Sequence, residues 1–447
     1  MGALTIFNKA TITNPVLTGY NTSYSPQSVV VSGNYAYIVD ASNDGLTILD
    51  ITNHISPTLV GSLYGTGSPN YLSYAYALIL DGDYAYVVSM TDDALVAIDV
   101  STVTAPTLAG VGRDSNHLES PKDLVKSGNY IYIASYGGVS SSALSVWDVT
   151  TPNAPAYFGK YSPGGTSSRV YTIRGVAISG NYAYCVSQYG VPGAGTGNLA
   201  VIDITAPATP SLYGALSHAK LLGGRSIAIS GNYAYLVSDT ADCMTVIDIT
   251  DPANPAYLTD FGGAGTPNYM NLPTAITIVG NYAFISCSTD DSMVIVDITT
   301  PATPTLVAAR AGLPNALNGC TGVAVSGDYV YVVGTGSVSS ASIPSLFPIN
   351  PLLRASGVER TFWAGVGGQS VYQTVLTMGG ISTTYVSPLG PREPASVITP
   401  TPLPSGPGYQ VADYEAWLVR TDLNTILKIF GRFPTYQDWL SRVKELQ

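Results

Sequence analysis

Charged residues are scarce in this chain of 447 residues, since only 11% are Asp, Glu, Lys or Arg and the formal net charge is −11. The lack of a basic footprint argues against unaided nucleic-acid binding, which depends on Lys and Arg contacts to phosphate. The residues typical of helical bundles are also few, whereas Val, Ile, Thr, Tyr and Gly are abundant. Because 46% of the residues are hydrophobic, the chain can bury enough surface to fold. We expect a mostly β protein.

Long hydrophobic runs are missing as well. The first residues, MGALTIFNKATITNP, contain no basic stretch followed by seven or more apolar residues, so they predict no secretory signal peptide. Apolar runs elsewhere have the length of strands and are interrupted by Ser, Thr and Gly, which predicts no transmembrane helix. The sparse charge nevertheless resembles an extracellular or virion surface. We therefore expect a virion or extracellular location, reached by lysis or through a signal peptide that was removed.

Cysteine is rare. Its four copies, Cys185, Cys243, Cys287 and Cys320, form no CxxC pair, and Cys185 occupies a slot that holds Ile, Val or Leu in other parts of the chain. This pattern favours buried, reduced thiols over disulfides or metal ligands.

Internal repeats are what the chain does contain. The tetrapeptide [SDV]-G-[ND]-Y occurs seven times at intervals of 46 to 52 residues, with its glycine at Gly33, Gly82, Gly128, Gly180, Gly231, Gly280 and Gly327. A short apolar run precedes each copy, and an alternating run such as YAYIVD follows it. Gly-Asn and Gly-Asp favour a two-residue hairpin turn, which needs positive φ at its central positions. The sequence therefore predicts seven β-hairpins.

A second motif, such as LTILDIT or LVAIDVS, follows each of the first six hairpins. A Pro-containing stretch and a fourth short strand come next, as in ISPTLVGSL. Four strands in a unit of about fifty residues, repeated along the chain, are typical of β-propeller blades. These residues resemble the LVIVD-repeat family over roughly residues 1–336, and the resemblance implies a propeller.

The seventh unit lacks its second half, and the missing half is found at the other end of the chain. After GDYVYVVG at 327–334 no Asp-Ile motif follows, whereas ALTIFNKATITNPVLTG at 3–19 aligns with GLTILDITNHISPTLVG at 45–61. We expect an all-β, seven-bladed propeller of four-stranded blades, in which the N-terminal segment supplies the outer strands of the last blade. Such closure removes free sheet edges.

Composition divides the chain into three parts: a propeller over 1–336, an extended Pro/Ser/Gly-rich arm with short strands over 337–408, and amphipathic helices over 409–447. The short strands of the arm are expected in ERTFWAGV, SVYQTVLT and ISTTYVS. Apolar residues at helical spacing predict one helix over 413–430 and a second from Thr435. The apolar residues expected to dock these helices are Trp417, Leu423, Leu427, Phe430, Trp439 and Leu440. They would dock on the propeller, on another copy or on a different protein.

Two recurrent residues have structural interpretations. One acid per blade precedes a turn and is expected to accept hydrogen bonds from turn amides: Asp50, Asp99, Asp148, Asp203, Asp248 and Asp297. The tyrosine of the GNYAY sequence is expected to pack between neighbouring sheets.

The two faces of the expected ring differ in their loops. On the variable face, long and dissimilar loops such as GRDSNHLES and LSHAKLLGGRS join the outer strand of one blade to the inner strand of the next. The regular face carries the tight Gly-Asn turns and the near-uniform TAPATP-type loops. Function is expected on the variable face. The candidate binding residues there are Tyr71, Arg113, His117, Arg169, Arg174, His218, Arg225 and Tyr269.

Catalytic signatures are missing, because the chain has neither a GxSxG elbow nor a Walker A loop. The three histidines are too scattered for a metal triad, so we predict no metal site and no cofactor. Acidic turns at 43–45, 92–93, 239–242 and 290–291 could each hold Ca²⁺, although turn chemistry is favoured. A propeller lyase or hydrolase is a weaker alternative, in which His117 and His218 line the central mouth. Arg113, Arg169 and Arg225 would join them there to bind an anionic group.

The favoured function is therefore a non-enzymatic interaction or adhesion protein. Loops rich in Tyr, Asn, Ser and Gly supply adaptable contacts, and exposed Tyr can stack on sugar rings. We expect a structural protein of a phage virion, such as a tail appendage, fibre or capsid decoration, with the propeller exposed and residues 337–447 contacting other virion or surface proteins. A bacterial cell-surface LVIVD-repeat protein is the alternative. Expected partners are a glycan or protein receptor on the variable face and other copies of the chain, but no nucleic acid.

Overall fold

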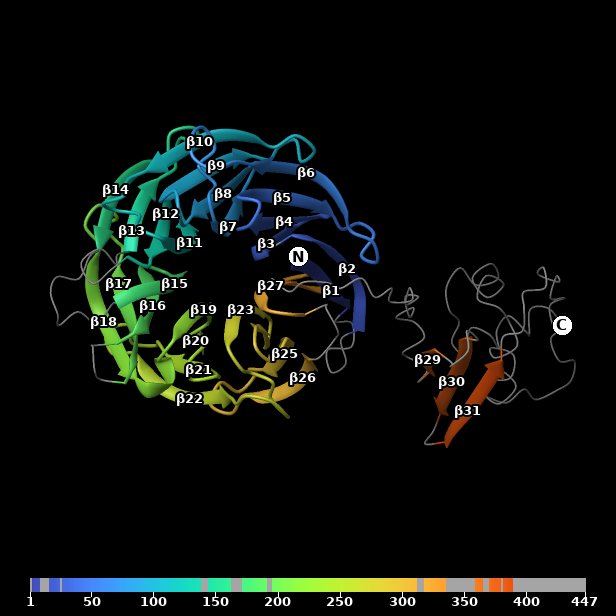
Figure 1. Ribbon diagram of the computed structural model, residues 1–447. Coiled ribbons are helices and arrows are strands. Elements are labelled where there is room, and N and C mark those ends of the chain that lie inside the picture. The colour runs from blue at the N-terminus through green and yellow to red at the C-terminus, as the bar shows by residue number, and fades with distance from the viewer. Residues whose placement is uncertain are drawn as a thin grey trace, which may run out of the picture. The chain divides into compact units, whose positions relative to one another are not determined.

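The structure is a computed structural model, and it describes residues 2–8, 16–24, 26–137, 144–161, 171–190, 195–311, 317–334, 358–364, 370–378 and 381–388. The chain divides into two compact units, Met1–Leu346 and Phe347–Gln447. The first unit is a ring of antiparallel sheets (Figure 1). Residues of the innermost strand of every sheet line a central cavity, the channel. Among the described residues the helical content is a single 3-10 turn, Ala219–Leu221.

Six blades are formed by four consecutive strands each, so every blade is a small antiparallel meander. Their strands, from the channel outward, are β3 Pro26–Ser32, β4 Tyr35–Asp40, β5 Gly45–Asp50 and β6 Thr58–Tyr64; β7 Ala75–Asp81, β8 Tyr84–Ser89, β9 Ala94–Asp99 and β10 Thr107–Arg113; β11 Pro121–Ser127, β12 Tyr130–Ser135, β13 Leu144–Asp148 and β14 Ala156–Tyr161; β15 Tyr171–Ser179, β16 Tyr182–Tyr189, β17 Gly197–Asp203 and β18 Ser211–His218; β19 Gly224–Ser230, β20 Tyr233–Ser238, β21 Cys243–Asp248 and β22 Ala256–Gly262; β23 Pro273–Val279, β24 Tyr282–Cys287, β25 Ser292–Asp297 and β26 Thr305–Ala311.

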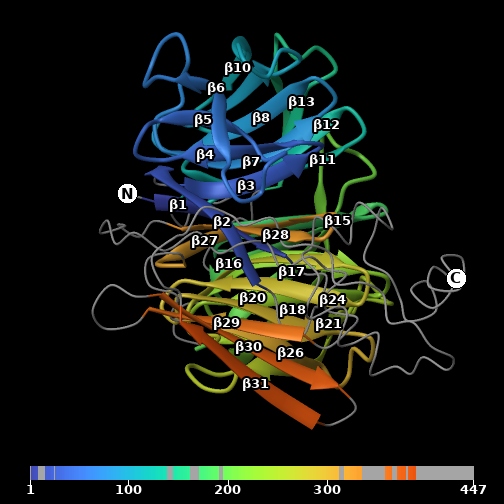
Figure 2. The same ribbon diagram turned by 90° about the vertical axis from the view of Figure 1, so that its right-hand side faces the viewer.

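A further four-stranded sheet closes the ring. It combines β27 (Cys320–Ser326) and β28 (Tyr329–Gly334) with β1 (Gly2–Asn8) and β2 (Val16–Tyr24) in the order β2-β1-β28-β27 (Figure 2). Strand β1 pairs antiparallel with β28, from Ala3 opposite Gly334 to Asn8 opposite Tyr329. The inner strand β27 lies beside β23 on one side and β3 on the other. The expected closure by the N-terminal segment is confirmed: beside the six blades of consecutive strands stands this seventh, composite sheet.

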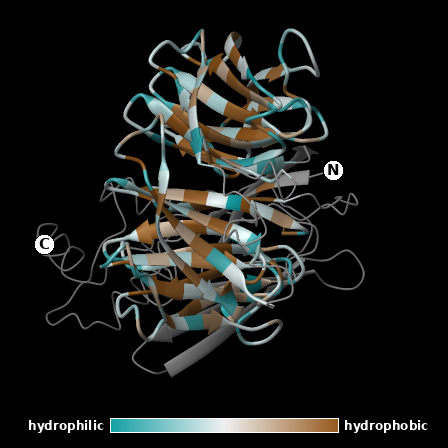
Figure 3. Ribbon diagram, turned by 90° about the vertical axis from the view of Figure 1, so that its left-hand side faces the viewer, coloured by the Kyte–Doolittle hydropathy of each residue, from teal (hydrophilic) through white to brown (hydrophobic). Residues whose placement is uncertain are grey.

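The hairpin motif explains the inner half of each blade. The seven hairpin glycines have φ between +53° and +58°, whereas none of the Asn or Asp residues that follow them has positive φ. The predicted two-residue hairpins are therefore present, but positive φ occurs only at the first central position of the turn, the type II′ pattern, and not at both positions as expected. The second tyrosine of the motif is buried between neighbouring sheets in six blades, and Phe284 takes its place in the remaining one. The expected packing role of this tyrosine is confirmed. Figure 3 shows the hydrophobic residues along the strands and the hydrophilic residues in the connecting loops.

The recurrent acid at the end of each third strand closes a local turn. Each carboxylate accepts a hydrogen bond from the backbone amide two residues later, at 2.7 to 2.9 Å, in all six blades of consecutive strands. Hydrogen bonds from the Thr150 side chain and amide lower the pKa of Asp148, and the other five acids behave alike. The structural interpretation of this acid is confirmed.

The four cysteines are buried and free, so the expectation of reduced thiols is confirmed. Burial raises the pKa of each thiol.

The second unit contains one three-stranded antiparallel sheet of β29 (Val358–Ala364), β30 (Ser370–Met378) and β31 (Ile381–Pro388). These strands coincide with the three segments predicted to be short strands. The predicted helices of 409–447, with their docking residues Trp417, Leu423, Leu427, Phe430, Trp439 and Leu440, lie outside the described residues.

Candidate functional site

The seven inner strands each place one bulged residue at the channel. In every inner strand the pairing with the second strand skips one position near its start. A bulge re-aims the side chain of the extra residue. The seven residues, each six positions before its hairpin glycine, are Gln27, Tyr76, Lys122, Arg174, Arg225, Thr274 and Thr321, and all of them line one cavity of about 190 Å³. We call this cavity the channel pocket. It lies where the inner strands begin, which is the variable face.

Charge is distributed unevenly around the channel pocket. The three cations, Lys122, Arg174 and Arg225, come from the consecutive inner strands β11, β15 and β19, whereas the other four bulged residues are neutral. One half of the pocket is therefore cationic although the protein carries a net charge of −11.

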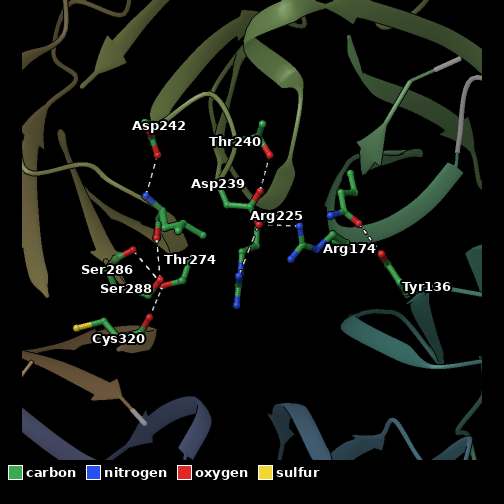
Figure 4. Close-up of polar contacts among 12 residues, drawn as sticks. Tyr136, Arg174, Arg225, Asp239, Thr240, Asp242, Thr274, Ser286, Ser288 and Cys320 are labelled. Carbon is green, nitrogen blue, oxygen red and sulfur yellow. Dashed lines mark hydrogen bonds and ion pairs between the residues drawn. The ribbon is translucent and has the colours of Figure 1, made fainter. Parts of the chain in front are cut away.

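Asp239 joins the two arginines. Its Oδ2 lies 2.7 Å from Arg174 Nη1 and 3.6 Å from Arg225 Nη1, and its other oxygen accepts a hydrogen bond from the Thr240 hydroxyl (Figure 4). The Asp239 side chain is only 10% exposed. Because Asp239 follows β20, it reaches the arginines from the second strand of the blade that carries Arg225. One carboxylate thus holds two guanidinium groups in place and leaves their combined charge at plus one.

Lys122 has a different environment. Its ammonium nitrogen lies 4.2 Å from the centre of the Tyr76 ring and 5.5 Å from that of Tyr136, and it contacts the sulfur of Met90. Burial, together with the charges of Arg174 and Arg225, lowers the pKa of Lys122 from 10.5 to about 8. Among the described residues, no carboxylate forms an ion pair with Lys122.

The next residue, Asp123, also lines the channel pocket. Its carboxylate accepts hydrogen bonds from the backbone amides of Val176 on β15 and of Leu124, both at 2.9 Å. Burial raises the pKa of Asp123 to about 7. This carboxyl connects β11 to β15 and so fixes the spacing between Lys122 and Arg174.

Carboxylates also hold the loops of the variable face in place. Oδ2 of Asp92 accepts hydrogen bonds from the amides of Gly67 and Ser73, and Oδ2 of Asp290 accepts the equivalent pair from Gly265 and Asn271. Four turn acids, Asp44, Asp93, Asp242 and Asp291, each bind one amide of the loop that enters the next blade. These carboxylates accept hydrogen bonds from backbone amides, as the turn-chemistry interpretation predicted. No cluster of His, Cys, Asp or Glu suited to a metal ion occurs in the described part of the chain.

The structure separates the predicted binding residues into two groups. Arg174 and Arg225 meet at the channel pocket. The others that can be described lie along the loops and outer strands: Arg113 stacks over the Tyr71 ring at 4.5 Å and donates to the carbonyl of Asp92, while Tyr269 accepts a hydrogen bond from the Thr266 hydroxyl. Arg169 lies outside the described residues.

The expectation that His117 and His218 line the central mouth is wrong. His117 stacks on Tyr157 of the outer strand β14 at 3.9 Å and bonds to Asp114. His218, at the end of the outer strand β18, stacks on Tyr257 of β22 at 4.0 Å. Because Tyr157 and Tyr257 occupy equivalent positions, both histidines pack against the outer strand of the following blade. They form contacts between blades at the outer strands.

Sequence reasoning missed Lys122, Asp239, Tyr76 and Tyr136. Aligning the seven units on the hairpin glycine puts Lys122, Arg174 and Arg225 in one column, so the signal was present for the cations and for Tyr76. Asp239 had been assigned to an acidic turn, and no spacing rule indicated that it pairs with two arginines from different blades.

Comparison with known proteins supports the architecture. The family model of the LVIVD repeat matches residues 25–64, 74–112, 120–162, 172–217, 224–261, 274–309 and 320–337. Solved structures with a similar fold include a protein from Lactobacillus plantarum (TM-score 0.55, 13% identity, covering 69% of this chain and 99% of that one). A putative 6-phosphogluconolactonase from Bacteroides fragilis is also similar (TM-score 0.53, 11% identity, 69% and 97%), as is a periplasmic gluconolactonase of Pseudomonas aeruginosa (TM-score 0.52, 11% identity, 68% and 94%).

At these identities the likeness shows a shared fold. No curated protein matches the chain. In the part of the chain that the structure describes, no helix is long and apolar enough to span a bilayer.

Proposed function

Because the chain belongs to the LVIVD-repeat family of β-propellers, we propose that it is a non-enzymatic recognition protein that binds an anionic ligand in the channel pocket. The observation that carries the proposal is the convergence of Lys122, Arg174 and Arg225 on one cavity, where Asp239 pairs with the two arginines and Asp123 is held by backbone amides. Such an excess of positive charge inside an acidic protein is costly unless something negative shares the cavity.

Electrostatics favours a ligand with one or two negative charges. The three cations, Asp239 and a partly ionised Asp123, whose pKa burial raises to about 7, leave the pocket with a net charge between plus one and plus two at neutral pH. Partly buried charges attract one another more strongly than surface charges because the protein screens them less than water does. The guanidinium groups can each offer two donors to a carboxylate or phosphate. The acidic exterior would repel the same ligand, so binding is confined to the pocket.

Binding rather than catalysis is proposed because the acids at the pocket are engaged. Asp239 is paired with two arginines, and Asp123 accepts two backbone amides. The histidines on which a lyase mechanism was based pack between outer strands. Carboxylated glycans and organic phosphates belong to the ligand class that remains.

The test measures binding of citrate and inorganic phosphate to the full chain by titration calorimetry. Replacing Arg174 or Arg225 with Gln should weaken binding by about tenfold or more each, because a hydrogen bond to a charged group contributes about 1.5–3 kcal/mol. Arg113→Gln is the matched control, since Arg113 belongs to the same face but lies outside the pocket. Equal losses for all three arginines would indicate diffuse surface attraction and would refute the pocket.

We also propose that residues 409–447 attach the propeller to a larger assembly, such as a virion or a cell surface. The support is their amphipathic sequence pattern after a Pro-rich arm, since helices of this kind need a partner to bury their apolar faces. Removing residues 400–447 should leave a folded propeller that no longer assembles. Unchanged incorporation into the assembly would contradict the anchoring role.

A further inference from the structure

Lys122 differs from the other two cations of the channel pocket in having no carboxylate partner among the described residues. Arg174 and Arg225 share Asp239, whereas the neighbours of the Lys122 amine are the rings of Tyr76 and Tyr136 and the sulfur of Met90. A lysine that only served as a counter-charge would be expected beside an acid. The second lysine of the same strand, Lys126, has such a partner, with its amine 3.0 Å from Asp81.

The surroundings of Lys122 lower the pKa of its amine, so a larger fraction of it is neutral near pH 8 than for an exposed lysine. The side chain is half-buried at the inner strand, and two guanidinium charges on the next two inner strands oppose its protonation. Desolvation and neighbouring cations are the two means by which proteins turn lysine into a nucleophile at neutral pH. Arg174 and Arg225 then have two effects, since they lower the proton affinity of the amine and attract an anion to it.

We propose that Lys122 is a nucleophilic amine that forms a reversible imine with an aldehyde or ketone bearing a carboxylate or phosphate, while Arg174 and Arg225 bind the anionic group. The inference rests on the proposed function of the same pocket and adds to it the chemical class of the ligand. A pocket of about 190 Å³ suits a small molecule of this kind.

The chemistry needs no cofactor. The lone pair of the neutral Lys122 amine attacks the carbonyl carbon, a carbon–nitrogen bond forms, and a proton passes from nitrogen to the carbonyl oxygen. The resulting carbinolamine then loses its hydroxyl group, which leaves with a proton as water, and a C=N bond remains. One water is released for each imine formed, nothing is oxidised or reduced, and hydrolysis reverses the step.

Pyridoxal 5′-phosphate is a suitable probe because it carries both an aldehyde and a phosphate. The full chain is incubated with a low concentration of it, the imine is fixed with borohydride, and the labelled peptides are identified by mass spectrometry. We expect Lys122 to be labelled before any other lysine, and the labelling rate to rise as the pH approaches 8. Pyridoxal, which lacks the phosphate, should label Lys122 at least tenfold more slowly.

Variants separate the amine from the anion site. Lys122→Arg keeps the positive charge and should abolish labelling at this position, whereas Lys126→Arg, on the same strand, should leave the labelling of Lys122 unchanged. Arg225→Gln should slow labelling by the phosphate-bearing probe and leave labelling by pyridoxal nearly unaffected. Circular dichroism and thermal unfolding establish that each variant is folded.

The outcomes distinguish the two proposals. If the probe binds in the pocket but Lys122 is labelled no faster than Lys126, the imine is refuted and anion binding stands. If neither citrate, phosphate nor the probe binds, both proposals are refuted. Preferential labelling of Lys122 that requires Arg225 supports both.

Discussion

Hydrogen bonds from backbone amides to Asp carboxylates hold the loops on both faces of the ring, but they span different lengths of chain on the two faces. On the regular face, each recurrent carboxylate binds an amide only two residues later, so every turn is complete within its own blade. On the variable face, Asp92 and Asp290 bind amides 19 and 25 residues earlier, in the loops that lead into their own blades. Local turns can repeat without change, whereas the longer connections allow each loop to differ.

This difference indicates on which face of the ring a binding site can form. The regular face is uniform because neighbouring blades pack closely there. The variable face is free to change its loops while the inner strands beneath them stay fixed, and the cationic half of the channel pocket has arisen at that end. The following predictions test this division, in order of decreasing effect.

Gly110→Ala should have the largest effect, and it should act on stability alone. A Cβ atom at Gly110 on β10 would lie 2.5 Å from the carbonyl carbon of Asn153 and 2.7 Å from the oxygen of Pro152, both in a regular-face loop of the next blade. Overpacking against backbone costs about 3 kcal/mol. Urea unfolding measures the loss, and the affinity for citrate should not change. A variant as stable as the wild type would show that blades can separate here at no cost.

Asp92→Ala should cost about 2 kcal/mol, because the amides of Gly67 and Ser73 lose a charged acceptor. The damage should be confined to the variable face. Hydrogen exchange should therefore accelerate at these two amides and stay slow in the regular-face turns. Asp290→Ala provides the matched case, with the effect moved to Gly265 and Asn271. Uniformly faster exchange in both variants would contradict a face-specific role.

Asp148→Ala should cost less, about 1 kcal/mol, because only one local turn loses its acceptor. The hydrogen bonds from Thr150 lower the folded-state pKa of Asp148 below 3.8, so this stabilisation is present above pH 3.8 and is lost as the pH falls through the folded-state value. Wild type and variant should therefore converge in unfolding free energy at strongly acidic pH. A difference that persisted there would assign another role to Asp148.

The smallest effect concerns the only histidine of the regular face. His54 stacks on Tyr329 of the closing sheet at 3.6 Å, and burial lowers its pKa below 6.5. The unfolded chain then binds a proton at His54 before the folded chain does, so stability is full above pH 6.5 and declines as the pH falls below it. Val103 occupies the position equivalent to His54 in the next blade, so His54→Val is a conservative replacement. This variant should reduce the pH dependence of the melting temperature between pH 7.5 and 5.5. An unaltered pH profile would exclude His54 as its source.

Much of the fold was predictable because its signals are local and repeated. The hairpin glycines require positive φ, the recurrent acids close turns two residues away, and the N-terminal segment carries the pattern missing from the last unit. The candidate site was predictable only in part. Arg174 and Arg225 were named as binding residues, but His117 and His218 were expected beside them, since loop residues were judged by their position on the face rather than by the strand they contact.

The sequence by itself determined the repeating blade, its turns, its buried tyrosines and the closure of the ring, because each depends on residues close together in the chain or on a pattern repeated in every unit. The tertiary structure alone decided which side chains meet. Lys122, Arg174 and Arg225 are about fifty residues apart, and Asp239 comes from another strand. A closed ring brings the three cations to one cavity because bulges at equivalent positions of successive inner strands direct their side chains toward the same channel.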